Sequence, residues 1–178
     1  PEGLDQVPSR IHDRGMTPRL IPIVETARGL ACVEALAAAD SVAAILFGGL
    51  DLSVDLGTAL DWDALLYARS RTVHAARLGG VGAIDMPFFD ISDHAGLSDD
   101  AARVRRLGFK GKTAIHPSHV SAIQEIFSPS EDEVTQARRV TEAARDSKGV
   151  FMLDDVMVDR PGIVAAERIV AWADAHER

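Results

Sequence analysis

Cysteine is nearly absent from this sequence of 178 residues, because Cys32 is the only one. A single thiol excludes a disulfide within the chain, and it excludes a metal site built from several cysteines. Chains that use cysteine so sparingly are typical of reducing compartments. We therefore expect a cytoplasmic protein.

Two further absences restrict the classes of partner. No basic run is longer than Arg103–Arg106, and the formal net charge is −8, so a surface for nucleic acid is not expected. No apolar stretch approaches the roughly 20 residues that span a bilayer, so no membrane partner is expected either.

What the chain does contain is enough apolar sequence for a core, since 47% of its residues are hydrophobic. That content and the chain length fit one main domain with a small appendage. The sequence begins at Pro1, without Met and without a signal-peptide pattern. We expect the numbered chain to be the later part of a longer polypeptide.

Two acidic residues each follow an apolar run. Glu25 follows residues 20–24, and Asp51 comes shortly after residues 42–47. The Ala-rich stretch 27–39 between them is predicted to be helical, which makes one βαβ unit with parallel strands. Both carboxylates would then lie at the carboxyl edge of the sheet. Two carboxylates so close repel unless a cation lies between them, and a divalent metal is the simplest cation.

Helix capping is the competing interpretation of this pair. Thr26 and Asp51 are good capping residues, and acids are common in the first turn of a helix. Gly48 and Gly49 favour a ligand site, because small residues let a backbone approach a ligand and leave N–H groups free to hold a carboxylate. A tight turn would call for the same glycines.

Two more strand–helix units follow. Residues 81–84 are a predicted strand that ends at Asp85, and residues 112–115 are one that ends at His116. Further helices are expected at residues 61–78 and 118–127. Between them, another helix is expected after the loop 86–90 and ends at about Leu107. Four units in series, each strand ending in a polar residue, fit half of a TIM barrel, which needs eight units and about 250 residues. An open parallel sheet is the alternative.

The alternation of strands and helices ends after residue 127. Ser130 and Glu133 form a capping-box pattern at the start of a charged helix. Residues 150–153 and 156–158 are a predicted hairpin, and a last helix follows Asp159. We therefore divide the chain into a barrel domain, 1–127, and a helix–hairpin–helix segment, 128–178, that would act as a lid or a subunit arm.

Three single features allow more than one interpretation. His116 would serve as a general base or ligand contact, or it is a hydrogen-bonded histidine before a proline turn. Asp159 would simply cap the last helix. The segment Gly111–Thr113 suggests a P-loop, but Arg106 stands where that motif requires glycine.

Several stretches together resemble one family, the HpcH/HpaI aldolases and citrate lyase β-subunits, which include malyl-CoA and citramalyl-CoA lyases. The matching stretches are residues 23–27 (IVETA), 47–52 (FGGLDL), 66–71 (LYARSR), 83–85 (AID), 108–112 (GFKGK), 114–118 (AIHPS) and 157–161 (MVDRP). They follow the family order and cover nearly everything from residue 19 onward.

The resemblance implies a TIM barrel of which this chain carries the fifth to eighth strands. It implies that Glu25 and Asp51 bind Mg²⁺, or Mn²⁺ in its place, and that Asp159 serves as acid/base in the site of a neighbouring subunit. The protein would then be a homo-oligomer, a trimer or a hexamer. Substrate contacts are implied for the backbone N–H groups around Gly48, Gly49 and Leu50, and for His116.

The implied activity is that of a Mg²⁺-dependent carbon–carbon lyase. It would cleave or form a 3-hydroxyacyl-CoA such as malyl-, citramalyl- or citryl-CoA, giving a 2-oxo acid and an acyl-CoA through a metal-stabilised enolate. A CoA-independent class II hydroxy-oxo-acid (pyruvate) aldolase is one alternative, and a non-catalytic subunit or binding protein is another. This chain departs from the family pattern at two places. The family has an acid where this chain has Leu50, and it has Gly–Arg or Gly–Lys where this chain has Asp155–Val156.

Overall fold

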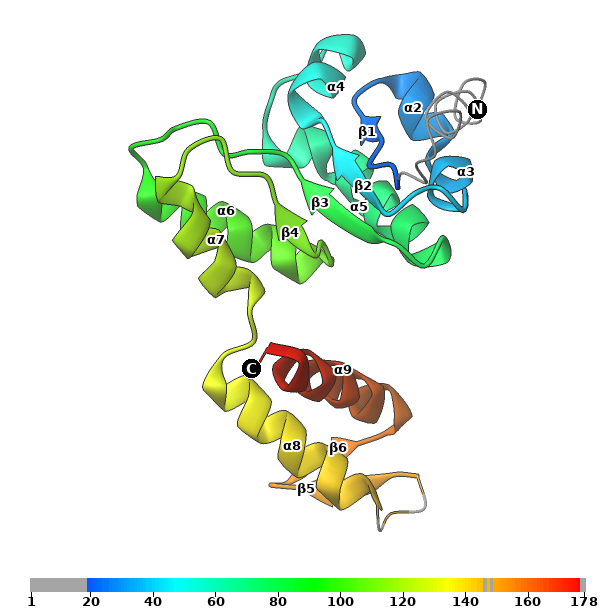
Figure 1. Ribbon diagram of the computed structural model, residues 1–178, viewed down its shortest axis with the longest axis vertical. Coiled ribbons are helices and arrows are strands. Elements are labelled where there is room, and N and C mark those ends of the chain that lie inside the picture. Colours follow the sequence, from blue (N-terminus) through cyan, green and yellow to red (C-terminus); the bar gives the residue numbers. More distant parts are fainter. Residues whose placement is uncertain (1–18, 146, 148, 177–178) are drawn as a thin grey trace, which may run out of the picture. The chain divides into compact units, whose positions relative to one another are not determined.

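The computed structural model of the chain describes residues 19–145, 147 and 149–176, and it divides into two compact units (Figure 1). The boundary lies between Phe127 and Ser128. Residues 1–18 of the predicted barrel domain lie outside the described ranges. Within those ranges, no helix combines the length and the apolar character that crossing a bilayer requires.

The first unit is built on a sheet of four parallel strands in the order β1–β2–β3–β4 (Figure 1). The strands are β1 (Ile23–Val24), β2 (Ala44–Phe47), β3 (Gly82–Asp85) and β4 (Gly111–Lys112). Each connection between neighbours must cross back over the sheet, and helices make these crossings. The predicted α/β class with a parallel sheet is confirmed.

Among the described residues of this unit, six helices accompany the strands: α2 (Ala27–Ala31), α3 (Val33–Ala37), α4 (Gly49–Leu56), α5 (Trp62–Leu78), α6 (His94–Leu107) and α7 (Ser118–Phe127). The predicted helical stretch 27–39 is helical over residues 27–37, but it is divided into two helices at Cys32. Cys32 leaves the helical conformation, with φ −109° and ψ 9°, and its N–H donates to the carbonyl of Gly29. This tight i→i+3 bond ends α2, and α3 begins at the next residue, Val33.

The two faces of the sheet have different surroundings. Side chains alternate along each strand, and one face carries Val24, Ile45, Phe47 and Ala83, which are buried. Helices α3, α5 and α6 contact the sheet and supply the core on this side.

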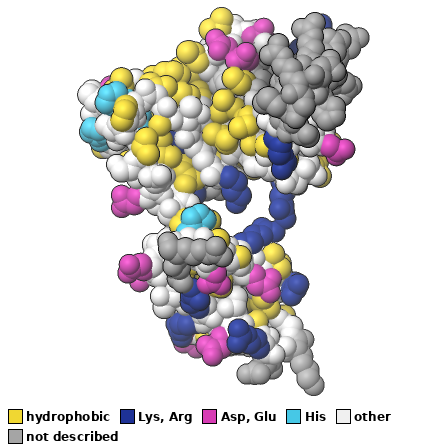
Figure 2. Space-filling model, in the orientation of Figure 1, with side chains coloured by type: hydrophobic (Ala, Val, Ile, Leu, Met, Phe, Trp, Pro, Cys, Tyr) yellow, Lys and Arg dark blue, Asp and Glu magenta, His cyan; other side chains and the backbone are white. Residues whose placement is uncertain are grey.

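The opposite face is only partly covered. Strand register aligns one row of residues across it: Ile23, Leu46, Ile84 and Gly111. Ile23 at one end of the row is 51% exposed, and Ile21 is exposed to the same extent. Hydrophobic side chains gather on the visible surface of this unit (Figure 2). Parallel sheets normally have both faces covered, so this face is unusual.

The side chain of Asp85 lies on the covered side of the sheet. Its carboxylate is fully buried and accepts from Arg69 Nε at 3.1 Å and from Lys112 Nζ at 2.8 Å. Lys112 also contacts Asp100 at 2.5 Å. The guanidinium of Arg69 lies over the ring of Trp62, 4.9 Å from its centroid. The network joins α5, β3, β4 and α6.

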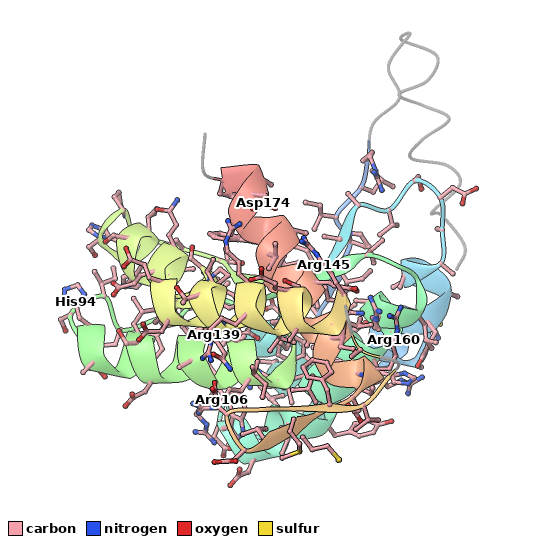
Figure 3. All side chains as sticks on the ribbon, turned by 90° about the horizontal axis from the view of Figure 1, so that it is seen from below. His94, Arg106, Arg139, Arg145, Arg160 and Asp174 are labelled. Atoms are coloured by element: carbon pink, nitrogen blue, oxygen red, sulfur yellow. The ribbon has the colours of Figure 1, made fainter. Side chains whose placement is uncertain are left out.

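The second unit contains a charged helix, a hairpin and a last helix: α8 (Glu131–Arg145), β5 (Phe151–Leu153), β6 (Val156–Val158) and α9 (Arg160–His176). The predicted capping box is confirmed, because Ser130 N–H donates to Glu133 and Glu133 N–H donates to Ser130 Oγ. The strands are antiparallel. Figure 3 labels Arg139 and Arg145 on α8 and Arg160 at the start of α9.

The hairpin turn is acidic and is tied to α8. Asp154 and Asp155 have φ of 50° and 61°, the left-handed pair that a two-residue hairpin turn requires. Asp154 accepts two hydrogen bonds from Arg139, at 2.7 and 2.8 Å. These hydrogen bonds lower the pKa of Asp154 below its usual value.

The buried network predicts a large stability loss for Asp85→Asn. The amide keeps the shape but leaves the buried cations of Arg69 and Lys112 without their shared anion, at a cost of about 3–5 kcal/mol. The measurement is the free energy of unfolding in urea. Asp99→Asn is the matched control, because Asp99 is an exposed acid on α6, and it should stay within about 0.5 kcal/mol of the wild type. Equal losses in the two variants would contradict the structural role of Asp85.

Candidate active site

Glu25 lies against the start of α4, at the carboxyl edge of the sheet. It directly follows β1. The pairing of β1 with β2 extends to the end of β1, where Gly48 N–H donates to the carbonyl of Val24 at 3.0 Å. A Cβ built on Gly48 would stand 2.7 Å from Glu25 Cβ and 3.3 Å from Glu25 Oε2. The side chain of Glu25 therefore passes directly over Gly48, which is the N-cap of α4.

Asp51 is in the first turn of that same helix. The two predicted acids therefore follow different strands, and both are placed beside the beginning of one helix. In the described part of the chain, neither carboxylate has a hydrogen-bonding or ion-pairing partner, and no three acids, histidines or cysteines form a group that could hold a metal. Two unpaired carboxylates suit a hard cation such as Mg²⁺, which commonly uses one or two protein carboxylates and takes its other ligands from water and substrate.

Backbone donors point outward at this helix start. The first N–H to bond within α4 is that of Leu52, which donates to the carbonyl of Gly48 at 3.1 Å. The N–H groups of Gly49, Leu50 and Asp51 therefore have no partner within the helix, as at any helix N-terminus. The N–H of Gly48 is different, since the sheet ladder already uses it. The expected carboxylate contacts are thus limited to the residues after Gly48.

Gly49 serves the packing of the protein as well. It is buried, and a Cβ there would stand 2.5 Å from Met86 Sδ and 2.7 Å from Phe47 Cε1. Close packing therefore requires a glycine here whether or not a ligand binds. Leu50, where the family pattern has an acid, is 43% exposed.

The start of α2, just after Glu25, is capped by two side chains. Thr26 Oγ1 accepts from Gly29 N–H at 3.0 Å, which confirms the capping interpretation for Thr26. Asp55 Oδ2 accepts from Ala27 N–H at 2.7 Å, although the two residues are 28 positions apart. Sequence reasoning missed Asp55. The available signal was its position four residues after Asp51, on the same face of α4.

His116 lies exposed in the connection between β4 and α7. Its Nδ1 accepts from Ser118 N–H at 3.2 Å and lies 2.8 Å from Ser118 Oγ. A nitrogen that accepts from a backbone N–H carries no proton, so a neutral His116 has its proton on Nε2, pointing away from the turn. The interpretation as a hydrogen-bonded histidine before a proline turn describes this geometry, and Nε2 keeps a free donor.

Asp159 belongs to the second unit and caps α9. Its Oδ1 accepts from Gly162 N–H at 3.2 Å, and its carbonyl accepts from Ile163 N–H at 3.0 Å. The local capping interpretation of Asp159 is therefore correct. Capping occupies one carboxylate oxygen and leaves the other for further chemistry.

Comparison with known proteins gives one consistent family. The model of the HpcH/HpaI aldolase/citrate lyase family matches residues 6–117. The chain is 32% identical to the citrate lyase subunit beta of Leuconostoc mesenteroides subsp. cremoris, over 90% of this chain and 55% of that protein. It is 35% identical to human mitochondrial citramalyl-CoA lyase, over 86% of this chain and 50% of that protein.

Solved structures agree with the sequence matches. The protein CitE from Mycobacterium tuberculosis, crystallised in complex with magnesium, acetoacetate and coenzyme A, superposes with a TM-score of 0.77 at 33% identity. The match covers 88% of this chain and 61% of that one. The chain thus spans about half the length of the curated relatives it matches. The family resemblance drawn from the sequence is confirmed.

The contact between Glu25 and Gly48 predicts that Gly48→Ala is destabilising. The added methyl group would collide with Glu25 Cβ and with Ile23 Cγ2, 2.7 and 2.8 Å away, and should cost about 1–3 kcal/mol and displace the Glu25 side chain. Gly111→Ala in β4 is the matched control, because nothing lies within 4 Å of a Cβ there. Urea unfolding checks the pair. Equal stability of the two variants would mean that Gly48 does not support Glu25.

Proposed function

This chain belongs to the HpcH/HpaI aldolase/citrate lyase family, and on that premise we propose that it is part of a Mg²⁺-dependent carbon–carbon lyase. The proposed substrate is a 3-hydroxyacyl-CoA such as malyl-, citramalyl- or citryl-CoA, which is cleaved to a 2-oxo acid and an acyl-CoA, or formed from them. The observation that carries the proposal is the placement of Glu25 and Asp51 beside the start of α4, where neither carboxylate has a protein partner in the described residues.

Glu25 and Asp51 would hold the metal. When bound, Mg²⁺ supplies positive charge that stabilises the negative charge developing on substrate oxygens as the carbon–carbon bond breaks. The N–H groups of Gly49 and Leu50 at the start of α4 would hold the substrate carboxylate, because the helix dipole and the unpaired donors both favour an anion there.

Proton transfer is assigned to Asp159. As a base it would accept the proton of the substrate hydroxyl, so that this carbon becomes the carbonyl of the 2-oxo acid while the bond electrons move to the acyl-CoA carbon. As an acid it would then return the proton to that carbon. Its second carboxylate oxygen, not used in the cap, is the atom available. The Nε2–H of His116 would donate to an acyl-CoA oxygen.

The partly covered face of the sheet supports a larger barrel. We infer that β1–β4 are the fifth to eighth strands of a TIM barrel and that the row from Ile23 to Gly111 faces its interior. In such a barrel the interior is filled by side chains from all eight strands, which would cover the exposed Ile23. The second unit would be the lid or subunit arm that brings Asp159 to a neighbouring subunit of a homo-oligomer.

A CoA-independent hydroxy-oxo-acid aldolase is the second candidate. The observation that favours it is the hairpin, where the family pattern has Gly–Arg or Gly–Lys and this chain has Asp155–Val156, which follow Asp154, the partner of Arg139. An acidic turn would repel the phosphates of CoA. Cleavage assays that compare CoA thioesters with the corresponding free hydroxy acids distinguish the two.

The metal assignment predicts that Glu25→Gln and Asp51→Asn each lose divalent-cation binding. Mn²⁺ titration followed by electron paramagnetic resonance, with Mg²⁺ competition, should give dissociation constants weaker than the wild type by more than about 100-fold, beyond what residues around a metal ligand usually cost. Asp99→Asn removes the same charge from an exposed helix position and should bind as the wild type does. Unchanged binding in both site variants would refute the metal assignment.

The subunit-sharing assignment predicts complementation between inactive variants. Asp159→Asn should lower kcat by about 10²–10⁴-fold while Mn²⁺ binding stays as in the wild type. Co-expression of Asp159→Asn with Glu25→Gln should restore part of the activity, because a mixed oligomer contains sites with an intact metal pair and an intact Asp159. Mixed oligomers that stay inactive would mean that each subunit completes its own site.

A further inference from the structure

Two connections hold the Glu25 segment to the helix that carries Asp51. The first is the sheet ladder, through the bond from Gly48 N–H to the Val24 carbonyl. The second is the bond from Ala27 N–H to Asp55, at 2.7 Å. The ladder fixes the backbone before Glu25, and the Asp55 bond fixes the backbone two residues after it. Together they confine Glu25 from both sides.

The second connection has a simple geometry. Asp55 lies one helical turn beyond Asp51 on α4, so both side chains leave the same face of the helix. Ala27 is the first residue of α2, where N–H groups lack partners within the helix. A carboxylate is the favoured acceptor there because it also meets the positive end of the helix dipole.

A third metal ligand is the alternative role for Asp55, and the contacts disfavour it. Its Oδ2 is already bonded to Ala27, and within the described ranges no group of three acids lies close enough to hold a metal. Asp55 is an acid near the pair whose carboxylate is turned toward the backbone of α2.

We propose that Asp55 is a positioning residue that holds Glu25 at the distance from Asp51 that a divalent cation requires. This inference rests on the proposed function, because it concerns the metal pair assigned there. Without the Asp55 bond, the start of α2 keeps the short cap from Thr26 but loses its link to α4, and Glu25 would sample positions in which its carboxylate is too far from Asp51. The cation then binds more weakly, although both ligands remain.

The experiment compares Asp55→Ala with Asp55→Asn in Mn²⁺ titrations of the full-length protein. Alanine removes the acceptor and should weaken binding by about 10–100-fold, the usual effect of losing a residue that orients a metal ligand. Asparagine keeps a carbonyl oxygen that can accept from Ala27 N–H, so it should restore the affinity to within about threefold of the wild type. Asp99→Ala controls for the loss of one negative charge from a helix and should leave the affinity unchanged.

Amide hydrogen exchange at Ala27 provides a readout that does not depend on metal. Exchange should be faster in Asp55→Ala than in the wild type and in Asp55→Asn, with the apo protein used for all three. Far-UV circular dichroism checks that the variants remain folded.

Each outcome identifies which idea is at fault. If Asp55→Asn binds Mn²⁺ as poorly as Asp55→Ala, the charge itself is needed and Asp55 acts as a ligand, so the positioning role is refuted. If Asp55→Ala binds as tightly as the wild type, while Glu25→Gln does not bind, the positioning role alone is refuted. If the wild type and Glu25→Gln bind Mn²⁺ equally, the metal assignment fails and this inference fails with it.

Discussion

Parallel pairing of β1 with β2 is the constraint on which the candidate site depends. Two parallel neighbours end at the same edge of a sheet, so the residues that follow them, Glu25 and the turn from Gly48, necessarily meet there. The pairing also demands a crossover, and α2 and α3 supply it. The start of that crossover comes directly after Glu25, and for this reason its caps, Thr26 and Asp55, bear on the position of the acid.

Three residues for which we propose functional roles also accept hydrogen bonds at the starts of helices. Asp159 and Asp55 both accept from helix N–H groups, and His116 accepts from the turn that opens α7. A side chain held by one hydrogen bond keeps a fixed direction for its other polar atom. An acid, base or orienting group benefits from such restraint, because its geometry is then set before the substrate arrives.

The buried ion network and the acid pair illustrate two outcomes for a carboxylate at the end of a strand. Asp85 ends its strand on the covered face, where Arg69 and Lys112 neutralise it, and it stabilises the fold. Glu25 follows its strand and lies over the glycine that starts α4, and among the described residues no cation is paired with it. Since side chains alternate between the two faces, a shift of one position decides between structural and functional surroundings.

The sequence by itself determined the features that depend on neighbours within a few positions. Apolar runs marked β2 and β3, Asp61 capped α5 through Ala64, and Gly108 ended α6 with φ 113°, because capping bonds and left-handed turns are local. The placement of Glu25 and Asp51 at the same edge of the sheet was also predictable, since the parallel pairing of β1 and β2 requires it. Only the tertiary structure decided the direction of Asp85 and the bond between Asp55 and Ala27. Those features depend on which distant segments come into contact, and such contacts leave no periodic pattern in the sequence.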